Sequence, residues 1–216
     1  MASRKTKKQY YAMRRTRKNA LLLAVFLFIA LAAVVDRQFL RPVRQTVQVA
    51  AWASDDYKRY HGQVFAVANV VDGDTLDIEA PDGQKPTTRI RLIGVDTPET
   101  KHPTVGVMYY GPQASAYAQQ QAQGQRVTVF LDTVSAERDR YGRLLAYAAL
   151  PDGRILNEAL IGNGYGYADL RFKHSRFDDY VRLMDTAMMQ KVGLWEQVTR
   201  KQLPAWLQRE RPELLR

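Results

Sequence analysis

The sequence predicts an α+β, mainly β domain: a small closed barrel of five strands with about three helices, preceded by one N-terminal transmembrane helix. Five segments between residues 62 and 151 have the alternation or the β-branched content of strands and are bounded by turn residues. Segments with helical spacing lie between and after them, and a long apolar run precedes them all. The 216 residues suit one well-buried domain with appendages, because two full domains would be tight.

The N-terminal part of the chain has the pattern of a membrane signal-anchor. Residues 1–19 carry eight basic and no acidic side chains, and residues 20–35 contain no polar side chain. As a helix, this apolar run spans about 24 Å, slightly less than a bilayer core, and local thinning can cover the difference. The basic flank favours a cytoplasmic N-terminus and an extracytoplasmic remainder in a bacterial-type cell membrane. Cleavage near residues 30–32, giving a secreted protein, is the alternative.

The net charge of +10 is typical of a nucleic-acid-binding protein, but its distribution is not. The basic N-terminal segment accounts for eight of these charges, which leaves +2 for residues 20–216. The basicity therefore does not predict a nucleic-acid-coating surface. The chain has no cysteine, which excludes disulfides and thiolate metal sites.

Three strands are predicted in the first half of the domain, which we place at residues 62–195. Residues 36–61 before it are expected to be a juxtamembrane connector, because a proline interrupts any helix leaving the membrane. Residues 63–71 are rich in β-formers and end at an Asp-Gly turn. Residues 75–80 and 87–95 alternate with period two around a Pro-Asp-Gly turn. A Thr-Pro dipeptide then ends the third strand, because proline cannot donate to a ladder.

A helix and two further strands follow. The helix is predicted from Pro112, which suits a first helical turn, to a glycine stop at Gly124. Residues 126–132 and 142–150 form the fourth and fifth strands. Five strands with inserted and appended helices indicate a barrel of the oligonucleotide/oligosaccharide-binding (OB) kind.

Two more helices and a tail complete the chain. Residues 155–164 predict a short helix, and a longer one runs from an N-cap at Ser175 to Gly193. The longer helix has one apolar stripe, which we interpret as core rather than as a ligand surface. The stripe consists of Phe177, Tyr180, Val181, Met184, Ala187 and Met188. The charged, proline-containing tail, residues 196–216, is expected on the surface.

Three segments carry a chemically related set of side chains. VVDGDT, RLIGVDTPETKHP and DRYGRLLAY contain Asp74, Asp96, Glu99, Arg91 and Arg143. Carboxylates hold a hard cation, arginines bind the doubly charged phosphorane, and one carboxylate handles water, so the set suits phosphodiester cleavage. Each of these residues, taken alone, could equally be a turn residue, a solvated charge or a member of a structural ion pair. The combination favours catalysis.

These segments, with YGPQAS and NEAL in the same order, resemble the staphylococcal (thermo)nuclease family over roughly residues 62–195. The resemblance is to a membrane-anchored member. It implies a five-stranded barrel with three helices and calcium-dependent endonuclease activity on DNA and RNA with little sequence preference. The products would carry 3′-phosphate and 5′-hydroxyl ends.

The resemblance also implies a role for each matching residue. Asp74 and Asp96 would give carboxylate oxygens to Ca²⁺, and Thr97 its backbone carbonyl. Glu99 would act on the attacking water as general base or orienting group. The scissile phosphate would be bound by Arg91 and Arg143.

A neighbouring phosphate or nucleotide would be contacted by Arg140 and Tyr141; the family's type member has lysine at the first of these positions, which changes donor geometry. That member also has two base-packing tyrosines, which ungapped matching replaces with Leu170 and Phe172. Tyr165 and Tyr167 lie nearby and would match only in a shifted alignment.

Two other classes of protein compete with the nuclease interpretation. A membrane-tethered OB module could bind nucleic acid without cleaving it. A tethered interaction domain could use the basic N-terminus to bind anionic lipid, but that leaves the carboxylate and arginine set without a purpose. The partners we expect are DNA and/or RNA, and the membrane through the N-terminal helix; no protein partner is inferred.

Overall fold

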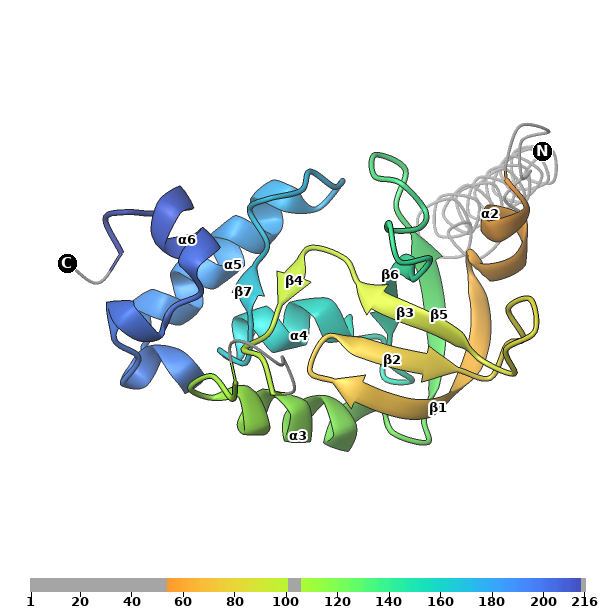
Figure 1. The fold of residues 1–216 in the computed structure, drawn as a ribbon, viewed down its shortest axis with the longest axis horizontal. Coiled ribbons are helices and arrows are strands. Elements are labelled where there is room, and N and C mark those ends of the chain that lie inside the picture. The colour runs from red at the N-terminus through yellow and green to blue at the C-terminus, as the bar shows by residue number, and fades with distance from the viewer. Residues whose placement is uncertain (1–53, 101–105, 215–216) are drawn as a thin grey trace, which may run out of the picture. The chain divides into compact units, whose positions relative to one another are not determined.

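A computed structural model describes residues 54–100 and 106–214. In this part of the chain five strands close a barrel in the order β1-β2-β3-β6-β5, which confirms the predicted barrel (Figure 1). The strands are β1 (Gln63–Asp72), β2 (Thr75–Ile78), β3 (Thr88–Leu92), β5 (Arg126–Leu131) and β6 (Leu144–Ala149). Neighbouring strands are antiparallel except β3 and β6, which run parallel.

The three predicted helices are α3 (Gly111–Ala122), α4 (Leu156–Gly162) and α5 (Phe177–Met189). Helix α5 buries Tyr180, Met184 and Ala187, which confirms the stripe as core. The predicted N-cap at Ser175 is wrong. The cap position is Arg176, without a side-chain cap, because the amide and the hydroxyl of Ser175 both donate to the carboxylate of Asp132.

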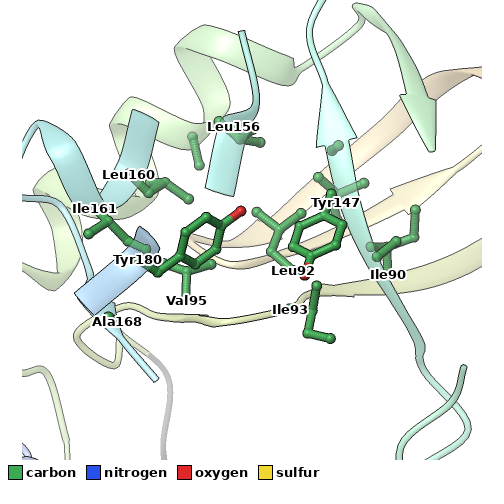
Figure 2. Packing of buried hydrophobic residues seen from close by; sticks show 14 of the residues in the cluster. Ile90, Leu92, Ile93, Val95, Tyr147, Leu156, Leu160, Ile161, Ala168 and Tyr180 are labelled. Atoms are coloured by element: carbon green, nitrogen blue, oxygen red, sulfur yellow. The ribbon is translucent and has the colours of Figure 1, made fainter. Parts of the chain in front are cut away.

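The core of the domain lies between the barrel and the helices α4 and α5. Two tyrosine rings, Tyr147 from β6 and Tyr180 from α5, extend into it and meet edge to face, with ring centres 6.2 Å apart (Figure 2). Aliphatic side chains from β3 and α4 surround them, so strands and helices share one apolar interior. These side chains include Ile90, Leu92, Leu156, Leu160 and Ile161.

Several short elements were not predicted. They are α2 (Asp55–Tyr60), the two-stranded pair β4 (Val95–Asp96) and β7 (Tyr167–Ala168), the 3₁₀ turns η3 (Gly193–Glu196) and η4 (Arg200–Gln202), and α6 (Ala205–Glu210). Helix α2 lies within the segment expected to be a connector. Its Tyr60 is fully buried and lies 2.9 Å, oxygen to oxygen, from the Thr88 hydroxyl.

The expectation that residues 196–216 lie on the surface is wrong for most of the large apolar side chains that the structure describes there. Leu203, Trp206, Leu207 and Leu214 are buried and belong to the hydrophobic core. Their burial fixes the fold of the segment that contains η4 and α6. This result determines one wall of the site described below.

The predicted basic segment, residues 1–19, and the predicted transmembrane helix, residues 20–35, lie outside the described residues. So does the connector as far as residue 53. In the described ranges, no helix is both long and apolar enough to cross a bilayer.

A single carboxylate, Asp132, joins the end of β5 to the start of α5. It accepts hydrogen bonds from the amides of Val134 (2.9 Å), Ser135 (2.8 Å) and Ser175 (3.0 Å), and from the Tyr147 hydroxyl (3.0 Å). Burial acts to raise the pKa of Asp132, but the hydrogen bonds from Ser175, Ser135 and Val134 outweigh it, and the pKa lies well below its usual range. The ionised form therefore stabilises the fold.

Asp132→Asn is expected to lower the free energy of unfolding by about 2–4 kcal/mol near neutral pH, because an amide cannot accept all of these charge-assisted bonds. The folded-state pKa is depressed, so the contribution is complete above the unfolded value of about 3.9 and is lost as the pH falls toward the folded value. Urea denaturation should therefore show that the difference in free energy of unfolding between wild type and variant becomes smaller below about pH 4. Asp152→Asn, in an exposed turn, is the matched control. If Asp132→Asn lowers the free energy of unfolding no more than Asp152→Asn does, the role of Asp132 is contradicted.

Candidate active site

Arg91 of β3 lies between two predicted cation ligands, Asp74 and Asp96. One guanidinium nitrogen is 2.6 Å from Asp96 Oδ1, and another pairs with Asp74 Oδ1. The β2–β3 register places Thr75 opposite Arg91, which brings the adjacent turn residue Asp74 to its side. Asp96 comes from β4, directly after β3. We call Asp74, Arg91 and Asp96 the carboxylate–arginine cluster.

The carboxylate of Asp74 is oriented by Thr97, the third predicted ligand. Its Oδ2 accepts hydrogen bonds from the Thr97 amide (2.9 Å) and from the Thr97 hydroxyl (3.0 Å), and both residues are only 5% exposed. Gly73 makes this approach possible, because a Cβ there would lie 2.6 Å from Thr97 Oγ1. The glycine of the VVDGDT segment is therefore required for close packing of the β1–β2 turn on the loop after β4.

Asp96 has two further partners, neither of which was predicted from sequence. The Trp206 indole N–H from α6 donates to Asp96 Oδ2 at 2.9 Å, and an Arg171 guanidinium nitrogen lies 3.2 Å from Asp96 Oδ1. The Arg171 guanidinium carbon is 4.5 Å from the centre of the Trp206 ring, within cation–π range. Burial acts to lower the pKa of Arg171, but the carboxylates of Asp169 and Asp96 raise it above its usual value, so Arg171 stays charged.

Glu99 shares a cleft of about 650 Å³ with Asp96 and Thr97. Its backbone carbonyl accepts a hydrogen bond from the Met108 amide at 2.9 Å. This bond joins the chain on the two sides of residues 101–105 and fixes the position of Glu99 at the cleft. The structure thus places Asp96, Thr97 and Glu99 at the cleft, and Asp74 and Arg91 contact this group through Thr97 and Asp96.

The other predicted site residues, Arg140, Tyr141 and Arg143, lie on the loop before β6. Asp139 organises this loop: its carboxylate accepts the amides of Tyr141 (2.9 Å) and Arg143 (3.0 Å) and pairs with the Arg143 side chain (2.7 Å). Burial acts to raise the pKa of Asp139, but these bonds hold it below its usual value. Tyr141 is 69% exposed, and its hydroxyl accepts a hydrogen bond from Arg140 at 2.8 Å. Asp139 is a loop-forming residue that the sequence reasoning missed.

Arg143 pairs with Asp139 and not, in the described part of the chain, with the carboxylate–arginine cluster. Its place is nevertheless set by the β3–β6 register, in which Arg91 lies opposite Leu145. Arg143 directly precedes Leu144, the first residue of β6, which lies opposite Ile90. The two arginines therefore belong to the same part of the β3–β6 pair, Arg91 on β3 and Arg143 at the entry to β6.

The aromatic positions near β7 differ in exposure. Tyr167 is 1% exposed and contacts Trp195 and Trp206 edge to face, so it is not available to stack on a base. Tyr165 stacks on Tyr117 at 4.1 Å between ring centres. Phe172 is 65% exposed. Of these rings, Phe172 is the one that solvent reaches most.

The donor set at the cluster fits a hard cation better than a transition metal. Two carboxylates and the Thr97 carbonyl are oxygen donors of the kind that Ca²⁺ prefers. Among the described residues, no group of three or more His, Cys, Asp and Glu side chains could hold a metal ion. Two carboxylates and one carbonyl supply fewer oxygens than the six to eight of a Ca²⁺ shell, so water or substrate oxygen would complete it.

A closed OB-type barrel with a carboxylate–arginine cluster beside a cleft is the architecture of a barrel hydrolase for phosphodiester substrates. The family model described as staphylococcal nuclease homologue matches residues 89–197. The chain belongs to this family and is a nuclease. The matched range contains Arg91, Asp96, Glu99 and Arg143; Asp74 precedes it.

Relatives with names of the same kind agree with this assignment. A thermonuclease of Staphylococcus intermedius is 35% identical over 136 residues, which cover 62% of this chain and 77% of that protein. A thermonuclease of Staphylococcus hyicus is 33% identical over 134 residues, covering 62% and 76%. An uncharacterised endonuclease of Escherichia coli O157:H7 is 33% identical over 152 residues, covering 70% and 86%.

Trp206→Phe is expected to lower the free energy of unfolding by about 1.5–3 kcal/mol, because it keeps an aromatic ring and removes the hydrogen bond to a largely buried carboxylate. Trp195→Phe is the matched control. The Trp195 indole N–H is buried and has no acceptor among the described residues, so its removal should cost less. Urea denaturation of both variants measures the difference. Equal losses would show that the bond from Trp206 to Asp96 contributes nothing.

Proposed function

We propose that this nuclease is a calcium-dependent endonuclease that hydrolyses DNA and/or RNA with little sequence specificity and leaves 3′-phosphate ends. The observation that carries the proposal is the position of Arg91 between Asp74 and Asp96, next to the cleft that Glu99 lines. Charges of both signs are thus held close together where a phosphodiester can enter. The names of the thermonuclease relatives support the same activity.

In this proposal Asp74, Asp96 and the Thr97 carbonyl hold Ca²⁺. When bound, the cation supplies positive charge that neutralises the phosphate as the phosphorane forms. Oxygen ligands at variable distances suit Ca²⁺, whereas Mg²⁺ demands a stricter octahedron.

The side chains of the chain supply the remaining chemistry. Glu99 accepts a proton from the attacking water or orients it, and the new bond forms between the water oxygen and phosphorus. The bond from phosphorus to the 5′ oxygen breaks, and that oxygen leaves as a hydroxyl after taking up a proton. Arg91 and Arg143 donate hydrogen bonds to the phosphate oxygens, where charge accumulates in the transition state.

Substrate contacts outside the scissile phosphate would come from the loop before β6. Arg140 and Tyr141 are exposed there and lie beside Arg143, whose guanidinium carbon is 5.6 Å from the centre of the Tyr141 ring. A cation and an aromatic ring side by side suit a phosphate and its attached nucleotide.

We also propose that residues 20–35 anchor the nuclease in a bacterial-type membrane, with the domain on the extracytoplasmic side. The support is the apolar run itself and the basic segment that precedes it. Cleavage of this segment would release a secreted enzyme. N-terminal sequencing of the membrane fraction distinguishes the two forms.

Alanine at Arg91, Glu99 or Arg143 is expected to slow turnover about 10²–10³-fold, as for the loss of one preorganised charged group. Degradation of single-stranded DNA by the full chain with Ca²⁺ measures the effect. Arg126→Ala and Glu79→Ala are matched controls, because both side chains belong to exposed residues of the barrel that do not line the cleft. If one of the Arg91, Glu99 or Arg143 variants keeps an activity close to that of the wild type, the substituted residue has no role in the mechanism. Binding of DNA without cleavage by the wild-type chain would favour the non-catalytic OB module instead.

Removal of calcium should abolish cleavage. EGTA is expected to reduce the rate to background, and added Ca²⁺ should restore it better than Mg²⁺ because the proposed site offers oxygen ligands without the strict octahedron that Mg²⁺ demands. The same DNA assay with each cation in turn is the measurement. A rate unaffected by chelation would contradict the cation model while leaving the nuclease assignment intact.

A further inference from the structure

The segment from Thr199 to Glu210 forms a wall of the cleft on the side away from the barrel strands. It contains η4 and α6, and it follows the last residue of the family match, residue 197. Lys201, Trp206 and Arg209 of this segment line the cleft that Asp96, Thr97 and Glu99 also line. One wall of the cleft contains Asp96, Thr97 and Glu99, and the opposite wall is a segment that the proposed mechanism does not use.

This wall is fixed to the reacting side of the cleft. Trp206 donates its indole N–H to Asp96 Oδ2 and lies against the Arg171 guanidinium. Leu203 and Leu207 anchor the segment in the core, and Arg200 donates to the Leu214 carbonyl at 3.0 Å, which ties the segment to the end of the described chain. Side chains on this wall are consequently held at a set position relative to Asp96.

The wall presents positive charge that internal contacts do not neutralise. The segment from Thr199 to Glu210 contains three basic side chains and one acidic side chain, Glu210 at its end. Arg200 is engaged with backbone carbonyls, whereas Lys201 and Arg209 are exposed and form no ion pair with any other described residue. Elsewhere in the described chain many arginines are paired with aspartate or glutamate, as Arg171 and Arg211 are. Two exposed cations that line a cleft and form no ion pair with a described residue are available to an anionic ligand.

We propose that Lys201 and Arg209 bind a phosphate of the single-stranded substrate that neighbours the scissile phosphate. This inference rests on the proposed nuclease function. We take the occupant to be a single strand, because a cleft of about 650 Å³ has the size of a small-ligand pocket and can hold a nucleotide of one strand. The strand would then be held on two sides of the cluster, by Arg140 and Tyr141 on the barrel loop and by this wall.

The test measures binding of a labelled single-stranded DNA dodecamer to the full chain carrying Glu99→Gln, in Ca²⁺, by fluorescence anisotropy. The salt concentration is varied from about 50 to 200 mM, because each phosphate contact on a single strand adds about 0.7 to the slope of log affinity against log salt. Because the two side chains bind one phosphate, Lys201→Gln with Arg209→Gln is expected to reduce the slope by about 0.7. Lys85→Gln with Lys191→Gln removes two exposed charges that do not line the cleft and should leave the slope unchanged.

The outcomes separate the two proposals. An unchanged slope in the Lys201 and Arg209 double variant, or an equal reduction in the control, would overturn the phosphate site. Absence of DNA cleavage by the wild-type chain would instead overturn the proposed function, and the binding slope would still report on the two cations. Circular dichroism of both double variants checks that they are folded, which is expected because the substituted side chains are exposed.

Discussion

The guanidinium of Arg91 lies between the carboxylates of Asp74 and Asp96, and the arrangement of the site depends on this contact. Two carboxylates this close repel each other unless a cation lies between them, and all three side chains are largely buried. The contact joins the β1–β2 turn, β3 and β4: the β2–β3 register places the turn beside Arg91, and β4 follows β3 in the chain. The same arginine that binds substrate phosphate in the proposed mechanism thus holds the two carboxylates together, so the loss of Arg91 affects both roles.

The sequence predicted the barrel well because its signals are local. Alternation of apolar residues and the Asp-Gly and Pro-Asp-Gly turns mark β1, β2 and β3, and the apolar stripe of α5 marks its buried face. The prediction at Ser175 failed because Asp132, 43 residues earlier in the chain, competes for its amide and hydroxyl. A capping pattern read from neighbouring residues cannot reveal such a distant partner.

The site was predicted only in part, because local motifs identify some of its residues but not the contacts between residues far apart in the sequence. Ordered motifs identified Asp74, Arg91 and Asp96, whose grouping the structure shows, but the contact from Trp206 to Asp96 spans 110 residues and has no periodic signal. The one available hint was a tryptophan among leucines in a segment otherwise rich in charge. Net charge was equally uninformative: residues 20–216 carry only +2, so placement of individual cations, and not total basicity, determines where an anion can bind.

The hydrogen bond from Trp206 to Asp96 also means that the site is completed late in the synthesis of the chain. Asp74, Arg91 and Asp96 are synthesised early, but the indole that completes their surroundings follows 110 residues later. At ribosomal rates of about 5–20 residues per second, the ribosome adds it roughly 5–20 s after Asp96. During that interval the growing polypeptide lacks one wall of the cleft. The complete cleft can therefore form only after residue 206 has been synthesised.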